Sequence, residues 1–293
     1  MTSLRYRIVN VFTQGRDRLS GNPLCVFESG EGLDDTTMQA LARQLNLSET
    51  TFILPSSRAS AHVRIFTPRY EMAFAGHPTL GTAHVLRALR GAGDEVTLEM
   101  HAGTIPVSAR GDVWTLDANA PRHRPVAASR AELAAMLGLA EADVAPRPDE
   151  PPLWVDTGSL QLVVPLASAD AVRRAAPRAD LLQVYGDNGQ RAMAYVWAAD
   201  PERGMPPDGA RPALARFFFP KYGAVVEDPG TGSACANLGG WLLATGAALP
   251  QRLAIGQGEA VGRPCRLGLE VTADRRIRVS GRVIEIGRGR ITL

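Results

Sequence analysis

The sequence has few of the residues that mark secreted, membrane or zinc-binding proteins. Of 293 residues only three are cysteine, and Lys221 is the one lysine. Three cysteines without a C-x-x-C pair give neither a disulfide framework nor a zinc knuckle, and they fit a reducing cytosol. No apolar run reaches the roughly 18 residues that a transmembrane helix needs, and the N-terminus lacks an apolar signal core. We therefore expect a cytoplasmic protein that has no membrane partner.

An excess of charge of one sign is also missing. Lys and Arg total 32, Asp and Glu total 30, and the formal net charge is +2. The arginines are scattered along the chain, so we expect no nucleic-acid partner. A hydrophobic fraction of 45% and a charged fraction of 21% can form a core, which excludes a disordered or fibrous chain. The length fits two average domains or one large domain.

Several motifs of cofactor and metal chemistry are absent. The sequence contains no P-loop, no H-E-x-x-H and no G-x-S-x-G. The segment from Gly230 through Gly232 to Cys235 is an imperfect dinucleotide fingerprint that follows Asp-Pro rather than a clean strand end. The histidines, at positions 62, 77, 84, 101 and 123, lack the usual metal-ligand spacing. A reaction without metal or cofactor remains, or no reaction at all.

An internal repeat is the most informative feature that is present. Arg64–Tyr70 and Arg216–Tyr222 both read R-x-F-x-P-x-Y. A Gly-rich segment and a helical pattern follow each copy, at residues 76–83 and 230–234. A repeat of about half the chain length indicates duplication, because solenoids need short repeats. We predict two halves of similar topology.

Hydrophobic patterns predict the elements of both halves. Asp34–Asn46 has an apolar stripe at helical spacing, and Ser129 with Glu132 forms a capping box for a short helix that Gly138 ends. Runs of β-branched and aromatic residues predict strands at residues 6–12, 24–27, 51–54, 61–66, 96–100, 104–109, 113–117, 160–166, 192–198, 214–219, 267–272 and 277–293. In the last of these, Gly281 and Gly287 are expected as turn points.

The helices predicted after the Gly-rich segments set the expected architecture. Thr79–Arg90 and Ser233–Gly246 are apolar around most of their circumference, as in helices wrapped by a sheet. We therefore predict an α+β fold of two pseudo-symmetric domains, each a curved, mainly antiparallel sheet around a central helix. Four prolines crowd into residues 146–152 and suggest a linker. The predicted halves are residues 1–125 and 126–277, with a strand at 278–293 that returns to the first half.

The two Gly-rich segments are candidate anion sites. A helix that starts there presents free backbone N–H groups, and its dipole favours a carboxylate or phosphate. In two pseudo-symmetric halves, these turns could face each other across a cleft. The alternative is that both are tight turns that need glycine for a positive φ.

Three titratable residues accompany these segments. His77 and Asp228 sit at the two turns, although His77 could be a satisfied polar residue and Asp228 could simply cap its turn. Glu49 follows a helix and enters an apolar strand, so partial burial would raise its pKa from about 4.3 toward the range of an acid–base catalyst. The alternative for Glu49 is a solvated loop position.

The motifs together resemble one family. The chain is similar to the phenazine-biosynthesis isomerase family (PhzF-like), which shares its fold with diaminopimelate epimerase. The motifs span nearly the whole chain in family order. They are Val11–Thr13, Gly21–Leu24, Asn46–Thr50, Arg64–Pro68, Ala75–Ala83, Glu227–Ala234, Gln257–Gly258 and Gly262–Pro264.

This resemblance implies two pseudo-symmetric domains with a cleft between them, commonly in a homodimer. It implies an isomerase that transfers a proton without metal or cofactor on a small carboxylate-bearing metabolite. By resemblance, Glu49 is the acid–base residue that moves a proton between two carbons, and His77 and Asp228 assist it. The implied substrate contacts are Asn22, Gly76, Gly230, Thr231, Gly232 and Ser233.

Two departures from related patterns bear on the reaction. Amino-acid epimerases of this fold have a cysteine at the start of each Gly-rich turn, at positions that are about Ala75 and Pro229 here. The thiol pair is absent, which disfavours two-thiol epimerisation. The Pro229–Gly230 pair also differs from phenazine-pathway members, so the resemblance leaves the substrate open. A non-catalytic ligand-binding protein is the alternative from another functional class.

Overall fold

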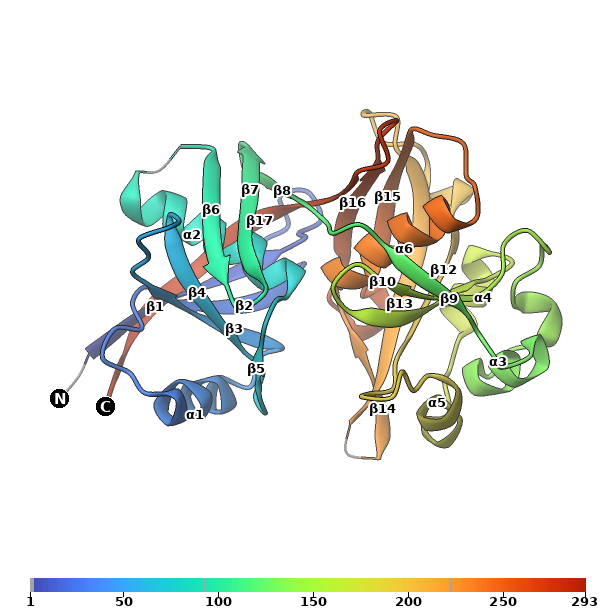
Figure 1. Ribbon diagram of the computed structural model, residues 1–293, viewed down its shortest axis with the longest axis horizontal. Helices are drawn as coiled ribbons and strands as arrows, with labels where there is room; N and C mark the ends of the chain where they lie inside the picture. Colours follow the sequence, from blue (N-terminus) through green and yellow to red (C-terminus); the bar gives the residue numbers. More distant parts are fainter. Residues whose placement is uncertain (1–2, 92, 222) are drawn as a thin grey trace. The chain divides into compact units, whose positions relative to one another are not determined.

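A computed structural model describes residues 3–91, 93–221 and 223–293, which form two compact units (Figure 1). Unit 1 contains the chain up to Asp117 and the segment Ser280–Leu293, and unit 2 contains Ala118–Val279. Tyr222, the last residue of the second repeat, lies outside the described residues. Within the described ranges, every helix is too short or too polar to span a membrane.

Unit 1 is a closed ring of strands. The ring runs β17–β1–β2–β3–β4–β6–β7–β8, and β8 pairs with β17 to close it. In the described part of this unit, the β2/β3 and β4/β6 registers are parallel. The elements are β1 (Ser3–Val11), β2 (Asn22–Phe27), α1 (Asp35–Leu45), β3 (Glu49–Leu54), β4 (Ala61–Phe66), β5 (Glu71–Met72), α2 (Gly76–Arg90), β6 (Glu95–Met100), β7 (Gly103–Arg110), β8 (Val113–Asp117) and the end of β17 (Ile277–Thr292).

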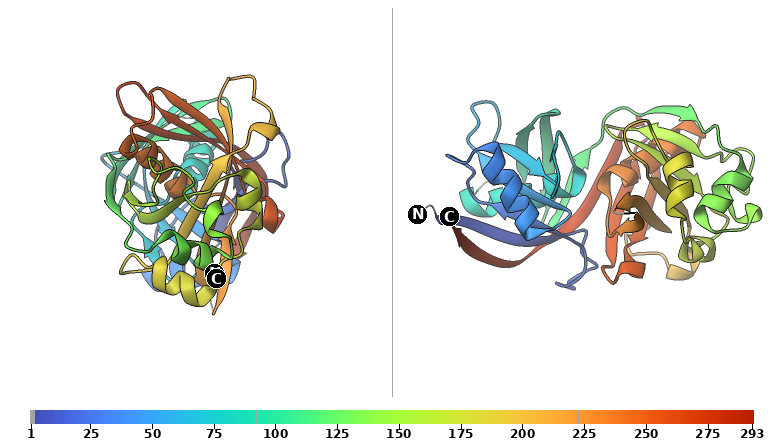
Figure 2. Two further views of the ribbon diagram at one scale, coloured as in Figure 1. Left: turned by 90° about the vertical axis from the view of Figure 1, so that its right-hand side faces the viewer. Right: turned by 90° about the horizontal axis from the view of Figure 1, so that it is seen from below.

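Helix α2 is the centre of this ring. It contacts β1, β2, β3, β4, β6, β7 and β8, and most of its residues from Gly76 to Leu86 are buried. The amphipathic helix α1 instead covers the outside of β3 and β4 (Figure 2). The Asp34 side chain caps α1, and Met38 packs with the stacked rings of Phe27 and Phe52. A helix that is apolar all round is thus inside the ring, and the amphipathic helix is outside it.

Unit 2 repeats this plan. Its strand order is β9–β10–β11–β12–β13–β15–β16–β17, with parallel registers for β11/β12 and β13/β15. The elements are β9 (Arg122–Pro125), α3 (Arg130–Leu137), η1 (Glu141–Asp143), β10 (Leu153–Asp156), β11 (Leu160–Pro165), α4 (Ala169–Arg174), α5 (Ala179–Tyr185), β12 (Ala194–Ala199), η2 (Pro201–Arg203), β13 (Arg211–Lys221), β14 (Ala224–Asp228), α6 (Gly232–Ala244), β15 (Gln251–Gln257), η3 (Glu259–Val261), β16 (Cys265–Val271) and the start of β17. The proline-rich residues 146–152 lie within this unit.

The two units share one topology. Strands β1, β2, β3, β4 and β6 of unit 1 correspond to β10, β11, β12, β13 and β15 of unit 2, and the parallel pairs fall at the same places. Helices α2 and α6 both follow a short strand, β5 or β14, that pairs with the strand of the repeat motif. The predicted α+β fold of two similar halves, each with a central helix, is confirmed.

The arginine of each repeat makes the same contacts in its own unit. Arg64 donates two hydrogen bonds to Glu71 on β5, at 2.7 and 2.6 Å, and lies over the Phe66 ring. Arg216 donates to Glu227 on β14 and lies over the ring of Phe218. The repeat therefore encodes a partly buried ion pair that joins the strand of the motif to the strand before the central helix.

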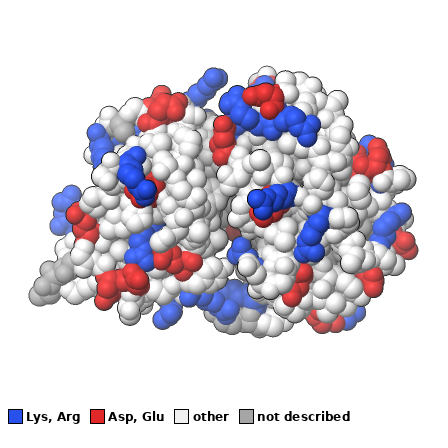
Figure 3. All heavy atoms as spheres, in the orientation of Figure 1, with Lys and Arg blue, Asp and Glu red and all other residues white. Residues whose placement is uncertain are grey.

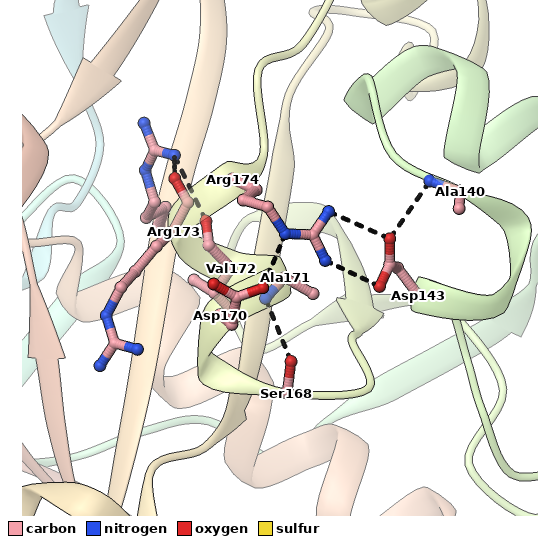
Figure 4. Close-up of polar contacts among 9 residues, drawn as sticks. Ala140, Asp143, Ser168, Asp170, Ala171, Val172, Arg173 and Arg174 are labelled. Atoms are coloured by element: carbon pink, nitrogen blue, oxygen red, sulfur yellow. Dashed lines mark hydrogen bonds and ion pairs between the residues drawn. The ribbon is translucent and has the colours of Figure 1, made fainter.

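Arg216 also connects this pair to the outer helices of unit 2. Its Nη1 donates to carbonyl oxygens at the end of α4, including Ala175 at 2.6 Å. Figure 4 shows how α4 is joined in turn to η1: Arg174 binds Asp143 on η1 and Asp170 on its own helix. Ser168 caps the start of α4. The strand that ends at Asp228 is thus fixed to a packed outer layer.

Some element boundaries differ from the predictions. The first central helix begins earlier than expected, at Gly76 instead of Thr79, so His77 is already helical, whereas the second begins at Gly232, directly before the predicted Ser233. Pro78 is tolerated because it lies in the first turn, where a backbone N–H has no helical partner. Gly281 and Gly287 are not turn points, since β17 runs unbroken from Ile277 to Thr292. A Cβ on Gly281 would lie 2.2 Å from Cδ1 of Phe12, so this glycine allows close packing.

The surface agrees with the balanced composition. Basic and acidic side chains are interspersed on the face that Figure 3 displays. Many of them form local ion pairs, such as Arg178 with Asp180 and Arg87 with Asp94. Such exposed pairs contribute little to stability.

We predict that Arg216→Leu strongly destabilises the protein. The substitution leaves the Glu227 carboxylate without its ion-pair partner, although its side chain is only 5% exposed. Removing one partner of a buried pair lowers the free energy of unfolding by about 3–5 kcal/mol. Denaturant unfolding measures this loss. Arg178→Leu is the control, because its partner Asp180 is well exposed. Equal effects of the two substitutions would contradict the role given to the repeated arginine.

Candidate active site

The first candidate site forms at one end of the ring of unit 1. Asn22 begins β2 and Glu49 begins β3, and these strands are parallel, with Leu24 opposite Glu49. Parallel neighbours start at the same edge of a sheet. His77 lies in the first turn of α2 and contacts Glu49, so the helix starts at this edge too. The fold therefore brings together Asn22, Glu49, Gly76 and His77, which the sequence predicted as site residues.

Glu49 and His77 form a partly shielded pair. His77 Nε2 lies 3.3 Å from Glu49 Oε2, and the side chains are 6% and 16% exposed. Burial lowers the pKa of His77 to about 3, although a hydrogen bond with the backbone of Pro23 acts in the opposite direction. His77 is therefore a neutral imidazole at neutral pH.

The position of the imidazole proton follows from its partners. Proline has no N–H, so its backbone can only accept through the carbonyl. Within the described chain, His77 Nε2 has no hydrogen-bond partner, so Nδ1 donates to Pro23. Nε2 then presents a lone pair toward Glu49. When the Glu49 carboxyl group is protonated, Nε2 can accept a hydrogen bond from it. The raised pKa expected for Glu49 stays a prediction.

Both central helices begin without a side-chain cap among the described residues. Ala75 and Thr231 occupy the N-cap positions of α2 and α6, and neither side chain caps the first turn. The first residues of the helices, Gly76 and Gly232, have no side chains to cover the backbone. First-turn amide groups of this kind can bind an anion, and the helix dipole adds to the attraction.

The second candidate site lies where β14 leads into α6 in unit 2. Asp228 is the last residue of β14, and its carboxylate accepts a short hydrogen bond from the Thr231 hydroxyl group. Asp228 therefore stabilises the turn through Pro229 and Gly230, as the simpler interpretation expected. The structure brings together Asp228, Thr231, Gly232 and Ser233 in this turn and the start of its helix.

Three buried amide side chains support this turn, and sequence reasoning did not assign them to the site. Gln161 donates to Ser233 Oγ at 3.0 Å and accepts from Asn237 at 2.8 Å. Asn237 also accepts from the Thr157 backbone and hydroxyl groups. Gln257 contacts Asp228 and Thr231. The available signal was a single amide, Asn237, inside an otherwise apolar helix, together with the Gln257–Gly258 motif.

The duplication identifies the counterpart of Glu49 in unit 2. Thr50 lies opposite Phe66, and Ala194 lies opposite Phe218, where both phenylalanines belong to the repeat motif. The residue before Thr50 is Glu49, and the residue before Ala194 is Met193, which is buried. Only the first half therefore carries a carboxylate at this position.

We predict that His77→Gln changes how stability depends on pH. The unfolded chain binds a proton on His77 below pH ~6.5, whereas the folded protein resists it down to about pH 3. The wild type therefore loses up to ~1.4 kcal/mol per pH unit from this group as the pH falls through that window. The stability advantage of wild type over His77→Gln should shrink between pH 6 and pH 4. His123→Gln, on the exposed strand β9, is the control, and parallel curves for wild type and His77→Gln would refute the assignment.

Comparisons with known proteins identify the family of the chain. The model of the phenazine biosynthesis-like protein family (PhzC-PhzF) matches residues 9–289. An uncharacterized isomerase of Pasteurella multocida is 37% identical, with 99% of this chain and 95% of that protein covered. The trans-2,3-dihydro-3-hydroxyanthranilate isomerase of Pseudomonas chlororaphis is 34% identical, with 98% and 99% covered.

A solved structure extends the likeness to the fold. The crystal structure of a PhzF-family phenazine biosynthesis protein of Bacillus anthracis superposes with a TM-score of 0.86 at 25% identity, and both chains are covered completely. The family match spans every element of both candidate sites. The chain belongs to the phenazine biosynthesis-like (PhzC-PhzF) family.

Proposed function

We propose that the protein is a PhzF-like isomerase that moves a proton between two carbons of a small carboxylate-bearing metabolite. The observation that carries the proposal is the buried contact between Glu49 and a neutral His77, which has no carboxylate counterpart in unit 2. Relatives over the whole chain are named isomerases, which supports the same class of reaction.

Glu49 performs both halves of the proposed reaction. Its carboxylate takes a proton from one carbon, and the electron pair of that C–H bond moves into an adjacent π system. The resulting carboxylic acid is stabilised by the lone pair of His77 Nε2. Glu49 then returns the proton to a second carbon. Because the proton goes back to the substrate, the step balances without a redox or group-transfer cofactor.

The single carboxylate favours transfer on one face of the substrate. Epimerisation with inversion usually needs one group on each face, and the position equivalent to Glu49 is the apolar Met193. The three thiols cannot replace a second base, because all are buried and burial raises the pKa of each, that of Cys25 to about 12. These observations support isomerisation rather than amino-acid epimerisation.

The carboxylate of the substrate is assigned to the uncapped helix starts. We propose that Gly76 and the segment Gly230–Ser233 serve one substrate in a shared cleft, with Asn22 as a further contact. The absence of side-chain caps on α2 and α6 among the described residues supports this assignment. We also propose a homodimer located in the cytoplasm, where the three free thiols stay reduced.

We predict that Glu49→Gln lowers turnover at least ~100-fold, because an amide keeps the size but cannot accept and return a proton. The assay follows isomerisation in deuterated water, starting with trans-2,3-dihydro-3-hydroxyanthranilate, the compound in the name of a relative. Binding of anthranilate as an unreactive carboxylate probe should change little. Glu31→Gln, at an exposed position of the same unit, is the matched control. Near-full turnover in Glu49→Gln would disprove the mechanism.

We predict that small carboxylates bind at the two helix starts. Crystals soaked in anthranilate should show its carboxylate within hydrogen-bond distance of the backbone N–H groups of Gly76 or of residues 230–233. Repeated binding of the probe elsewhere, with both turns empty, would contradict the shared site.

A further inference from the structure

Gln257 connects both ends of the turn that precedes α6. It is the last residue of β15 and is completely buried. Its Nε2 donates to the Asp228 carbonyl oxygen at 2.9 Å and to Thr231 Oγ1 at 3.0 Å. Its Oε1 accepts from the Thr231 backbone N–H, with an N to O distance of 3.4 Å. One amide group thus satisfies a carbonyl, a hydroxyl and an N–H of the same turn.

These contacts set the direction of the neighbouring hydrogen bonds. The Gln257 NH₂ group can only donate, so the Thr231 hydroxyl oxygen accepts from it. The Thr231 proton is then directed to the Asp228 carboxyl group, with which it makes a short contact. Asp228 Oδ2 is therefore the acceptor of this bond, and its orientation depends on Gln257 through Thr231.

The backbone on both sides of Gln257, at the end of β15, is closely packed. Gly258 has a φ of +79°, and a Cβ there would lie 2.4 Å from the carbonyl oxygens of both Pro229 and Arg263. On the other side of Gln257, a Cβ on Gly256 would lie 1.9 Å from Arg203 Nη1. Arg203 is itself bound to the buried Asp200. Gln257 therefore extends from a backbone that has little room to move.

The other half shows that the fold does not need an amide at this position. Ala61 pairs with Leu98, and Ala213 pairs with Ile255. Each alanine lies three residues before the arginine of its repeat motif. Counting along β6 and β15 from these pairs places Met100 at the position of Gln257. Met100 also contacts the start of its central helix, through Sδ to Thr79 Oγ1 at 3.6 Å. A methionine thus supports the first helix start, whereas the second has a three-contact amide.

We propose that Gln257 is a positioning residue of the active site, which holds the Asp228 carboxyl group in place through Thr231 and orients the first-turn amides of α6 toward the substrate's carboxylate. This inference rests on the proposed function, which assigns the substrate's carboxylate to the turn before α6. The effect on the turn itself is independent of any substrate. The two parts can therefore be measured separately.

The first test uses Gln257→Met, which introduces the residue that the other half has at this position. Amide hydrogen exchange in residues 228–233 should become at least ~10-fold faster, because the Thr231 N–H loses its acceptor. Gln251→Met, at the partly exposed start of β15, is the matched control and should leave this exchange unchanged. Unaltered exchange in a folded Gln257→Met protein would overturn the proposal.

The second test uses Gln257→Glu and the pH. When protonated, the introduced carboxyl group can accept as the amide does and replace one of the two hydrogen bonds that Gln257 Nε2 donates. When ionised it can donate neither and would face Asp228. Burial and this like charge raise the pKa of the introduced group, while Arg263 and Arg203 nearby act against the rise and the Cys265 thiol opposite stays neutral. The protection of the amides in residues 228–233, measured against the intrinsic exchange rate at each pH, should therefore be high at low pH and fall as the pH rises. The same pH dependence in Gln257→Met, which cannot titrate here, would refute this role.

Kinetics decide whether the turn serves catalysis. With trans-2,3-dihydro-3-hydroxyanthranilate as probe, Gln257→Met should lower kcat by about 10- to 100-fold, with a smaller change in KM. Relative to the wild type at the same pH, Gln257→Glu should recover kcat as the pH falls. Faster exchange with unchanged kcat and KM would overturn the positioning role and leave only a structural one. If the wild type does not turn over the probe, the proposed function fails for that compound, and the exchange data still decide whether Gln257 orders the turn.

Discussion

The contact between a neutral His77 and Glu49 is the interaction on which the account depends. It exists because β2 and β3 are parallel and α2 starts at the same edge of the ring. Burial keeps the imidazole uncharged, and the Pro23 carbonyl holds its proton on the far nitrogen. The nitrogen that remains can accept a hydrogen bond from the Glu49 carboxyl group, but its low pKa makes it a poor proton acceptor and it has no proton to donate. The carboxyl group is therefore the one member of the pair that can carry a proton to and from carbon.

Duplication explains the scaffold, and divergence explains the site. Arg64 and Arg216 make equivalent ion pairs with Glu71 and Glu227, so the structural contacts of the repeat were kept in both halves. The residues at the positions that the candidate sites use differ between the two halves. Glu49 is matched by Met193, and Met100 is matched by Gln257. One half thus has the acid–base group, and the other has the more elaborately supported turn.

Much of the fold could be predicted from the sequence because its signals are local. The repeat motif predicted the duplication, and the apolar circumference of α2 and α6 predicted that strands surround them. The missed strands were short or interrupted: β9 reads Arg-His-Arg-Pro and is exposed throughout, and β15 contains Gly256 between polar ends. Gly281 was mistaken for a turn because its real constraint, the Phe12 ring, lies far away in the sequence.

The candidate site was predictable only in part, for the same reason. Motifs pointed to Glu49, His77 and Asp228 one by one, but the tautomer of His77 and the role of Gln257 depend on long-range pairing of strands. The most direct test of the central claim is a single turnover with substrate deuterated at the carbon that loses its proton. A single carboxylate predicts that part of the deuterium appears at the new carbon, on the face from which it left. Hydrogen from solvent on the opposite face, with no deuterium transferred, would contradict the account.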